Sequence, residues 1–409
     1  MKCRHCAAPL ERVFLDLGSA PPSNAYLTET TLRTPELWFP LRLLVCGRCW
    51  LVQTEDHAGR EALFCADYAY FSSYSASWLR HSHDYVQAMR ERFGLGAASL
   101  VAEIAANDGY LLQYVRAAGI PCYGIEPTAS TAAAARARGI EIIERFFGVA
   151  LADELVAQDR QVDLVAANNV LAHVPDINDF VAGFARLLKA DGVATFEFPH
   201  LLRMVADNQF DTAYHEHYSY LSLHSVERVF AANGLAAFDV EELPTHGGSL
   251  RVYAQRADTG GRAAAPRLAA LREREVAAGI ATPAFYGGFQ ARANRVKNDF
   301  HAFLIETHRA GRTVAAYGAA AKGNTLINYS GVRPDLLPFV ADANPAKQGR
   351  YLPGSRIPIV APARLDAARP DYVVLLPWNL KDELMEQLGH ARAWGARFVT
   401  AVPRLEVAP

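Results

Sequence analysis

From residue 99 onward the chain alternates short apolar runs with longer stretches in which apolar residues recur every three or four positions. The short runs predict buried strands and the longer stretches predict amphipathic helices. Strands separated by helices of this length imply a parallel sheet that is covered on both faces. The predicted strands are 99–104, 122–125, a third strand that ends before Phe146, 162–167 and 193–198, and the predicted helices are 111–118, 128–138 and 177–188.

The same alternation restarts in the last third of the chain, after a Gly-Gly pair at 260–261 and a charged helical run at 268–276. A strand at 313–317 leads through a turn of small residues into a helix. This rhythm predicts a second, smaller doubly wound unit. Its other predicted strands are 337–342, 372–376 and 398–402.

The start of the chain lacks this alternation but contains two Cys-x-x-Cys pairs, Cys3 with Cys6 and Cys46 with Cys49. Each pair presents two thiolates at the spacing that tetrahedral zinc requires, and two pairs complete a shell of four sulfurs. Because four thiolates leave no open coordination position, we expect a structural Zn²⁺. Disulfide bonds are the alternative, and the double spacing and a cytosolic setting disfavour them.

At 409 residues the chain is too long for one ordinary domain. A helical pattern at 75–93 opens the central unit. We therefore expect an α/β protein of three domains: a zinc module at 1–75, a doubly wound domain at 76–290 and a smaller Rossmann-like α/β domain at 291–409.

Composition narrows the range of partners. Hydrophobic residues make up 51% of the chain and charged residues 21%, with a net charge of -2, which is typical of a packed globular protein. Such a balance argues against a nucleic-acid or membrane-surface partner. The sequence contains neither a signal-peptide pattern nor an uncharged stretch of membrane-spanning length. We therefore expect a cytoplasmic protein that is a monomer or a weak homo-oligomer.

The turn after the first strand of the central unit lies where an open α/β sheet binds a nucleotide. It contains Glu103, Ala105, Asn107, Asp108 and Gly109, and it lacks most of the glycines of a pyrophosphate-binding turn. S-adenosylmethionine carries no phosphate, so it does not need that close approach of the backbone. It does need an acidic residue at the end of each of the first two strands. The turn therefore predicts a site for S-adenosylmethionine.

Glu126 follows the second strand, about 20 residues after this turn, at the spacing expected of a ribose partner. Taken alone, Glu126 is as easily an ordinary charge at a helix N-terminus; with Glu103 in register, we favour the ribose. Phe146 and Phe147 follow the third strand, where they either flank an adenine ring or pack in the core. Asn168 closes the fourth strand, where we expect the methionine end.

Ionisable and aromatic side chains crowd residues 210–220, after the fifth strand. Methyl transfer to carbon needs a base beside a carbonyl group and donors that hold the enolate. His217 with the adjacent Glu216 suits proton removal, because the ordinary pKa of histidine is nearest neutrality. Tyr214 belongs to the same segment, and His173 lies just past the fourth strand on the same rim.

Two other interpretations of this segment stay open. His215, Glu216 and His217 are potential metal ligands, although histidines two residues apart fit a strand and no further ligand cluster lies nearby in sequence. The segment is alternatively a polar patch at a domain boundary. His173, as a single residue, is alternatively a core histidine.

Seven motifs occur in order along the whole chain. They are the paired Cys-x-x-Cys, Pro21-Pro22-Ser23-Asn24-Ala25, the turn at 103–109, Ala172-His173-Val174-Pro175, Tyr214-x-Glu216-His217, Thr245-His246-Gly247-Gly248-Ser249 and Tyr317-Gly318-Ala-x-Ala-Lys322. Together they resemble the bacterial nucleotide-sugar C-methyltransferase family. Members of that family methylate a nucleotide-linked 4-keto deoxysugar on the carbon next to the keto group, typically C-3.

The resemblance implies a class I methyltransferase fold and roles for particular residues. It implies that His217 is the base and that Glu216 is its partner or an alternative base. Tyr214, His173 and Tyr68 would surround the keto sugar, and the zinc module would form one wall of its pocket. In one respect the chain departs from the family, since Ala105 stands where glycine is usual.

The resemblance also implies that the third domain binds the nucleotide of the substrate. The turn at 318–324 precedes a helix N-terminus, where backbone N–H groups and a lysine can meet a diphosphate. The alternatives are an O- or N-methyltransferase acting on a similar sugar, and a zinc-containing binding protein with an inactive methyltransferase fold. The expected substrate-binding residues are Asn24, His246, Gly247, Gly318, Lys322, Asn324 and Asn379.

Overall fold

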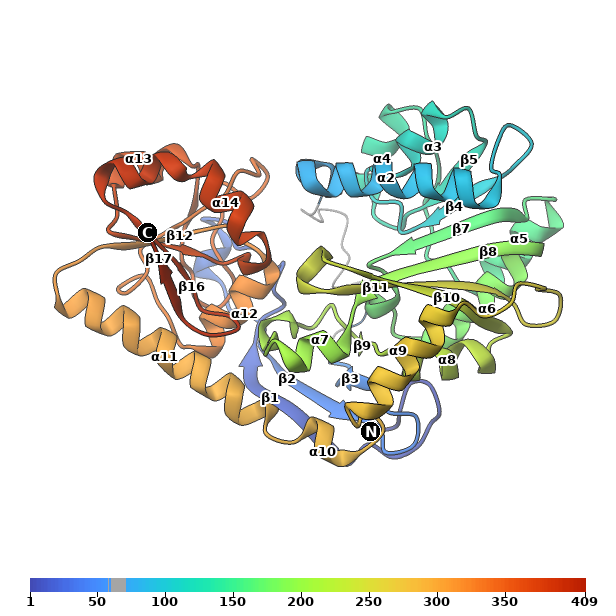
Figure 1. The fold of residues 1–409 in the computed structure, drawn as a ribbon. Coiled ribbons are helices and arrows are strands. Elements are labelled where there is room, and N and C mark those ends of the chain that lie inside the picture. The colour runs from blue at the N-terminus through green and yellow to red at the C-terminus, as the bar shows by residue number, and fades with distance from the viewer. Residues whose placement is uncertain (58, 60–70) are drawn as a thin grey trace.

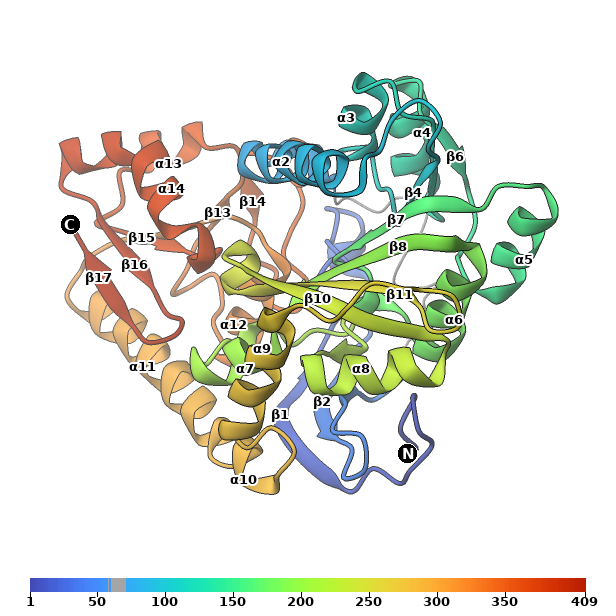
Figure 2. The same ribbon diagram turned by 45° about the vertical axis from the view of Figure 1, so that its right-hand side comes forward.

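The computed structural model describes residues 1–57, 59 and 71–409, so Tyr68 lies outside the described residues. Three β-sheets organise this part of the chain. In Figure 1 the C-terminal sheet lies on the left and the central sheet on the right, and the first strands of the N-terminal sheet lie beneath and between them. The turned view in Figure 2 keeps this arrangement.

The N-terminal sheet is antiparallel and joins segments that are far apart in sequence. Its strands are β1 (Arg12–Ala20), β2 (Phe39–Val45), β3 (Val52–Thr54) and β9 (Ser219–Tyr220), in that order. Val52 of β3 pairs with Tyr220 of β9. The cysteine-bearing segment is therefore bonded through its backbone to the segment that contains Tyr214 and His217, a link that the sequence does not predict.

The central sheet is the predicted doubly wound one, with the order β10-β11-β8-β7-β4-β5-β6. The chain runs outward from β4 to β6 and then crosses back to β7 and β8, so the strand order reverses between β4 and β7. Ligands of open α/β sheets bind at such a switch point, beyond the carboxyl ends of the strands. The parallel strands are β4 (Val101–Ile104), β5 (Cys122–Ile125), β6 (Glu141–Ile143), β7 (Val162–Asn168) and β8 (Leu188–Pro199).

The antiparallel hairpin of β10 (Leu235–Leu243) and β11 (Ser249–Arg256) completes this sheet. β11 lies antiparallel to β8, with Ser249 opposite Pro199. The hairpin turn therefore lies at the same edge as the carboxyl end of β8. The βα alternation did not predict these strands, because only a three-residue 3-10 turn, Thr245–Gly247, separates them.

Helices cover both faces of the central sheet, as predicted. Along β4, Val101 packs toward α2, α3 and α4, whereas Ala102 packs toward α5, α6 and α8. Ser75 caps the first of these helices by accepting a hydrogen bond from the backbone N–H of Trp78. The helices are α2 (Ala76–Phe93), α3 (Leu112–Ala117), α4 (Ala129–Ala137), α5 (Val149–Ala157), α6 (Ile177–Leu187), α7 (Leu201–Ala206) and α8 (Leu223–Ala232).

The C-terminal sheet has the order β14-β13-β12-β15-β16-β17 and is parallel except for its last strand. Its strand order reverses at β12, so it is the second doubly wound unit. β13 keeps only two residues of the predicted strand 337–342. The elements are β12 (Val314–Tyr317), α12 (Ala321–Tyr329), β13 (Val340–Ala341), β14 (Ile359–Val360), α13 (Ala363–Ala368), β15 (Tyr372–Leu375), α14 (Lys381–Gln387), β16 (Arg397–Thr400) and β17 (Glu406–Ala408).

Three helices link the two large sheets: α9 (Pro266–Ala277), α10 (Pro283–Tyr286) and α11 (Phe289–Arg309). In both figures α11 runs along the lower edge of the molecule, from the N-terminal sheet to the C-terminal sheet. Phe289 of α11 stacks on Phe14 of β1 with 4.7 Å between ring centroids. The N-terminal and C-terminal sheets thus share one hydrophobic core. In the described ranges no helix combines the length and the hydropathy needed to cross a bilayer.

Candidate active site

The carboxyl ends of β4 and β5 meet through Glu126. Its buried carboxylate accepts hydrogen bonds from the backbone N–H groups of Asn107 and Thr128, both at 2.9 Å. The turn after β4 is thereby held against the end of β5. An acidic side chain at this point of a switch crevice is oriented for the hydroxyl groups of a ribose.

The turn after β4 adopts an unusual backbone conformation. Ala105 has φ +58° and Asn107 has φ +47°, both in the left-handed region that non-glycine residues rarely adopt. At Gly109, with φ +79°, a Cβ atom would lie 2.4 Å from Cδ1 of Ile140, so only glycine fits. Glycine, which the resemblance implies at the position of Ala105, would adopt this conformation without strain.

Two polar side chains at this edge are buried. Glu103 is fully buried, and this burial raises the pKa of its carboxyl group well above the usual range, while Tyr110 opposes the rise by hydrogen bonding. Asn168 is 6% exposed, and neither its amide oxygen nor its amide nitrogen has a hydrogen-bond partner in the described structure. A buried amide with both groups unsatisfied indicates a site that a polar ligand fills. The buried carboxyl and amide groups of the crevice therefore fit the polar groups of S-adenosylmethionine.

A segment that the sequence did not predict at this site, Ser72–Ser73, crosses the turn after β4; we call it the strap. The backbone N–H groups of Ser72 and Ser73 donate to the side chains of Asn107 and Asp108, at 2.9 and 3.3 Å. Arg138 of the helix that follows β5 binds Ser73 Oγ and the main-chain oxygen of Asp108. Asn107 and Asp108 therefore hold the strap, a role that only the folded chain reveals.

Phe147 does not lie free at the crevice. Its ring is 7% exposed and packs edge-on against Phe180, at 5.7 Å between centroids, and against Phe184, at 5.2 Å. These contacts within the core favour the packing alternative for Phe147 over the expected contact with adenine.

The segment after α7 contains Tyr214, Glu216 and His217, which the sequence predicts as the reaction centre. Nδ1 of His217 donates to the carbonyl oxygen of Thr212 at 3.0 Å, and the hydroxyl of Tyr214 lies 2.7 Å from Nε2. A carbonyl oxygen only accepts, so the proton of the neutral ring sits on Nδ1 and Nε2 is the basic nitrogen. Burial lowers the pKa of His217 well below its usual value, with His173 adding to the effect.

His173 and Glu216 adjoin this ring. Nδ1 of His173 donates to the backbone carbonyl of Glu216 at 2.9 Å, and the rings of His173 and His217 are 4.6 Å apart. Burial lowers the pKa of His173 to about 4 and raises the pKa of Glu216. Asn24 donates from its backbone and its side chain to Oε1 of Glu216, both at 3.2 Å. The Asn24 amide, which we expected to bind substrate, thus holds Glu216, whose Oε2 has no hydrogen-bond partner in the described structure.

The histidine pair does not form a metal centre. His215 and Glu216 lie in a turn rather than a strand, and Nε2 of His215 donates to the carbonyl of Pro40 on β2, away from the Thr212 carbonyl that binds His217. The spacing argument was therefore wrong about the strand. In the described part of the chain, the only group of metal-ligating side chains is the cysteine cluster.

The C-terminal unit brings a second polar cluster toward the same segment. Nζ of Lys322 donates to Oδ1 of Asn379 at 2.7 Å and lies 4.7 Å from the ring centre of Trp378. Nε1 of Trp378 in turn donates to Asp211 at 2.7 Å. Burial lowers the pKa of Lys322 to about 8 and raises that of Asp211 to about 6. Asp211 and Trp378 were not predicted as site residues, because in the sequence they are marked only by the polar segment and the strand end on which they lie.

Other predicted substrate residues border this cluster. Gly318, with φ +87°, follows β12, and a Cβ there would lie 2.4 Å from Pro377. Gly247 has φ +90°, and a Cβ would lie 2.5 Å from the Trp378 ring. Asn324 is 1% exposed, and its amide groups have no partner in the described ranges. His246 accepts a hydrogen bond from Asn169, which follows β7, at 3.2 Å.

The four cysteines converge as predicted. Sγ of Cys3 lies 3.5 Å from Sγ of Cys49, and Sγ of Cys6 lies 3.5 Å from Sγ of Cys46. All four are free thiols, so they are not paired as disulfides. Zinc–sulfur bonds of about 2.3 Å require sulfurs about 3.8 Å apart in a tetrahedron, which the cluster approaches. The cluster fits Zn²⁺.

Comparisons with known proteins agree with this geometry. Residues 3–64 match a zinc binding domain, residues 78–240 a methyltransferase domain and residues 244–403 the C-methyltransferase C-terminal domain. The C-methyltransferase NovU of Streptomyces niveus is 34% identical over 406 residues, which cover 99% of this chain and 96% of NovU. The chain belongs to this C-methyltransferase family. It is an S-adenosylmethionine-dependent C-methyltransferase with a four-cysteine zinc site.

Solved structures also match the C-methyltransferase chain. Magnesium protoporphyrin IX methyltransferase from Synechocystis, with bound S-adenosylmethionine, is 16% identical with a TM-score of 0.34, covering 44% of this chain and 79% of that chain. The YcgJ protein from Bacillus subtilis is 15% identical with a TM-score of 0.34, covering 43% of this chain and 99% of that chain.

Proposed function

We propose that this C-methyltransferase methylates C-3 of a nucleotide-linked 4-keto deoxysugar. The observation that carries the proposal is the His217 imidazole, which is buried, neutral and fixed with its basic Nε2 toward Tyr214. A carbon beside a keto group loses a proton to such a base, whereas transfer to a hydroxyl or an amine needs a carbon base less. The 4-keto sugar supplies the acidic C–H bond.

In the proposed reaction, Nε2 of His217 takes the C-3 proton, and the electron pair of that C–H bond passes to the keto oxygen as an enolate. Tyr214 is the expected donor to the enolate oxygen, and Tyr68 joins it by family resemblance. His173, whose one ring N–H is bound to the Glu216 carbonyl, is expected to orient the sugar instead. S-adenosylmethionine supplies the methyl group when bound. The enolate carbon then bonds to that methyl group, and the electrons of the carbon–sulfur bond remain on sulfur. Glu216, with one oxygen held by Asn24, is the alternative base.

For the nucleotide end we propose the C-terminal domain, residues 291–409. The amino end of α12, the left-handed turn at Gly318 and the Lys322 ammonium group together suit a diphosphate. The unsatisfied amide of Asn324 supports a polar ligand nearby. Residues 76–290 would then hold the methyl donor and residues 1–75 the zinc, with the sugar between the three domains.

Substitution of the proposed base tests the function. His217→Asn should abolish both turnover and solvent exchange of the C-3 proton, while affinity for S-adenosylhomocysteine stays unchanged. His215→Asn is the matched control, because His215 binds the carbonyl of Pro40 instead. Exchange at the normal rate in His217→Asn would refute the role of His217 as base.

The product identifies the acceptor atom. A C-3 methyl group on a quaternary carbon gives a singlet in the proton NMR spectrum of the product. The carbon that bears this methyl group should still be bonded to the C-4 keto carbon. A methyl signal on oxygen or nitrogen would refute the proposed function and support a different acceptor. Thymidine and guanosine diphosphosugars with a 4-keto group are the substrates to try first.

A further inference from the structure

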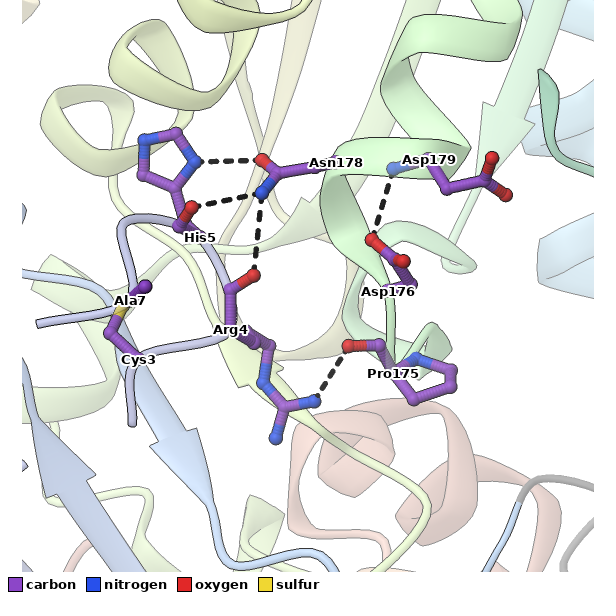
Figure 3. A pocket seen from close by; sticks show the side chains of 8 residues that line it. All are labelled: Cys3, Arg4, His5, Ala7, Pro175, Asp176, Asn178 and Asp179. Carbon is purple, nitrogen blue, oxygen red and sulfur yellow. Dashed lines mark hydrogen bonds between the residues drawn. The ribbon is translucent and has the colours of Figure 1, made fainter. Parts of the chain in front are cut away.

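Arg4 lies between the first two zinc-ligand cysteines, yet its side chain reaches the segments around the reaction centre. Nη1 donates to the carbonyl oxygen of Pro175 at 2.9 Å, and Nη2 donates to the carbonyl oxygen of Thr54 at 3.0 Å. The guanidinium carbon also lies 5.3 Å from the ring centre of Tyr218. The side chain is only 4% exposed. Figure 3 shows the guanidinium group directed at Pro175, away from the cysteine.

Nη2 of Arg4 also pairs with the exposed carboxylate of Asp56 at 2.9 Å. Two other contacts of the guanidinium group lie close to reaction-centre residues in sequence. Pro175 is two residues beyond His173, and Tyr218 directly follows His217. Thr54 adds a second tie, since its Oγ1 donates to the carbonyl oxygen of His217 at 3.0 Å and its N–H donates to the carbonyl oxygen of Tyr218 at 3.2 Å. One buried guanidinium group therefore joins both histidine-bearing segments to β3.

The zinc module holds Arg4 firmly at its other end. The Arg4 backbone N–H donates to Oε1 of Gln53 at 2.9 Å, and Nε2 of Gln53 donates to Sγ of Cys3 at 3.3 Å. Asn178 at the start of α6 binds the backbone oxygen of His5 at 2.9 Å and the His5 ring at 2.8 Å (Figure 3). The knuckle is thus bound to both β3 and α6, so the backbone from which the Arg4 side chain extends is held in place.

We propose that Arg4 is a positioning residue. It links the ordered zinc knuckle to the reaction centre and holds the loops of His173 and His217 in fixed relative positions. A planar guanidinium group suits this task, because its fixed fork of donors reaches two carbonyl oxygens at once while it stacks on an aromatic ring. The kinetic part of this inference rests on the proposed function, whereas the structural part does not.

The decisive measurement is hydrogen–deuterium exchange of the full, zinc-loaded chain, which needs no sugar substrate. The variants are Arg4→Met, which keeps an unbranched apolar stem but has no donors, and Arg4→Lys, which keeps the charge but not the fork. Arg48→Met is the matched control, because Arg48 is the exposed arginine of the second knuckle. Zinc content and affinity for S-adenosylhomocysteine are measured on every variant.

We expect Arg4→Met to raise exchange in residues 170–175 and 212–220 but not in the cofactor turn 103–109, with zinc and cofactor affinity retained. The turnover number should fall about 100-fold with little change in KM, because small displacements of reacting groups have losses of this size. Arg4→Lys should restore part of both properties, and Arg48→Met should match the unmodified chain.

Unchanged exchange in 170–175 and 212–220 would overturn the proposal, and so would loss of zinc from both Arg4 variants, since Arg4 would then serve only the knuckle. A product with its new methyl group on oxygen or nitrogen refutes the proposed function instead, and the exchange result still decides the role of Arg4.

Discussion

Ala105 has a left-handed backbone conformation, with φ +58°. That conformation costs an L-residue about 1–2 kcal/mol, and the greater freedom of an unfolded glycine cancels part of the relief. Ala105→Gly should therefore raise the free energy of unfolding by about 0.5–1 kcal/mol, as measured by urea denaturation. Ala106→Gly is the control. Ala106 is fully buried and lacks the left-handed φ, so its substitution should destabilise the chain. Equal losses in both variants would contradict the argument.

Lys322 controls the alkaline side of substrate binding if it meets a diphosphate as proposed. Burial lowers its pKa to about 8, so the ammonium group loses its proton as the pH rises through that value. KM for the diphosphosugar should then rise about tenfold per pH unit above pH 8. In Lys322→Arg the charge persists and this rise should vanish. Lys381→Arg, at a lysine paired with Glu406, should leave it in place. The same rise in Lys322→Arg would exclude Lys322 as its source.

At the residue scale, the sequence predicts contacts between functional residues that lie only a few positions apart. The four cysteines converge because each pair is set by a short knuckle, and Tyr214 meets His217 because they are only three positions apart in one turn. Contacts across long separations are not encoded in spacing. Asn24 meets Glu216 over 192 positions, and Trp378 meets Asp211 over 167. Neither partner shows a pattern that could identify the other.

At the element scale, helix-separated strands were predictable and short antiparallel ones were not. The central strands and helices follow the periodicity closely, because each buries one apolar run or stripe. β9 has two residues, and β10 and β11 have only a short 3-10 turn between them. Their pairing is set by tertiary packing, which a single sequence does not display.

The pairing of β3 with β9 makes the zinc site a support of the reaction centre. Removal of the metal should release the knuckles, because the zinc–sulfur bonds that join them are lost and zinc binding contributes directly to folding. Turnover should be lost, while S-adenosylhomocysteine still binds the central sheet. Trp50, stacked on Tyr286 at 5.8 Å, reports the change. Its fluorescence should shift to the red on chelation, and Trp50→Phe should lack that shift. Equal loss of cofactor binding would contradict this separation.

At the scale of the whole molecule, the sequence predicted the three units but not how they join. Side chains of the N-terminal sheet, α11 and the C-terminal sheet pack in one core, so the outer units form one continuous support beside the central sheet (Figure 1). Polar contacts then connect that support to the site. Trp378 is the clearest of them, because it reaches from the end of β15 to Asp211 beside the reaction centre.

Trp378→Phe should reveal the energy of the Trp378–Asp211 contact through the pH dependence of the free energy of unfolding. Burial raises the pKa of Asp211 from 3.8 to about 6, so the carboxylate is charged at pH 8 and protonated at pH 5. Between the two pKa values the folded chain keeps a proton that the unfolded chain releases, and stability therefore falls as the pH rises toward 6.

The indole donor stabilises the charged form. Its loss should cost about 1.5–3 kcal/mol at pH 8 and about 1 kcal/mol at pH 5, measured by urea denaturation. Trp394→Phe removes a donor to the neutral carbonyl of Pro370 and should cost the same at both pH values. A pH-independent loss in Trp378→Phe would mean that the ring acts by packing alone, and the polar joint between the units would then lie elsewhere.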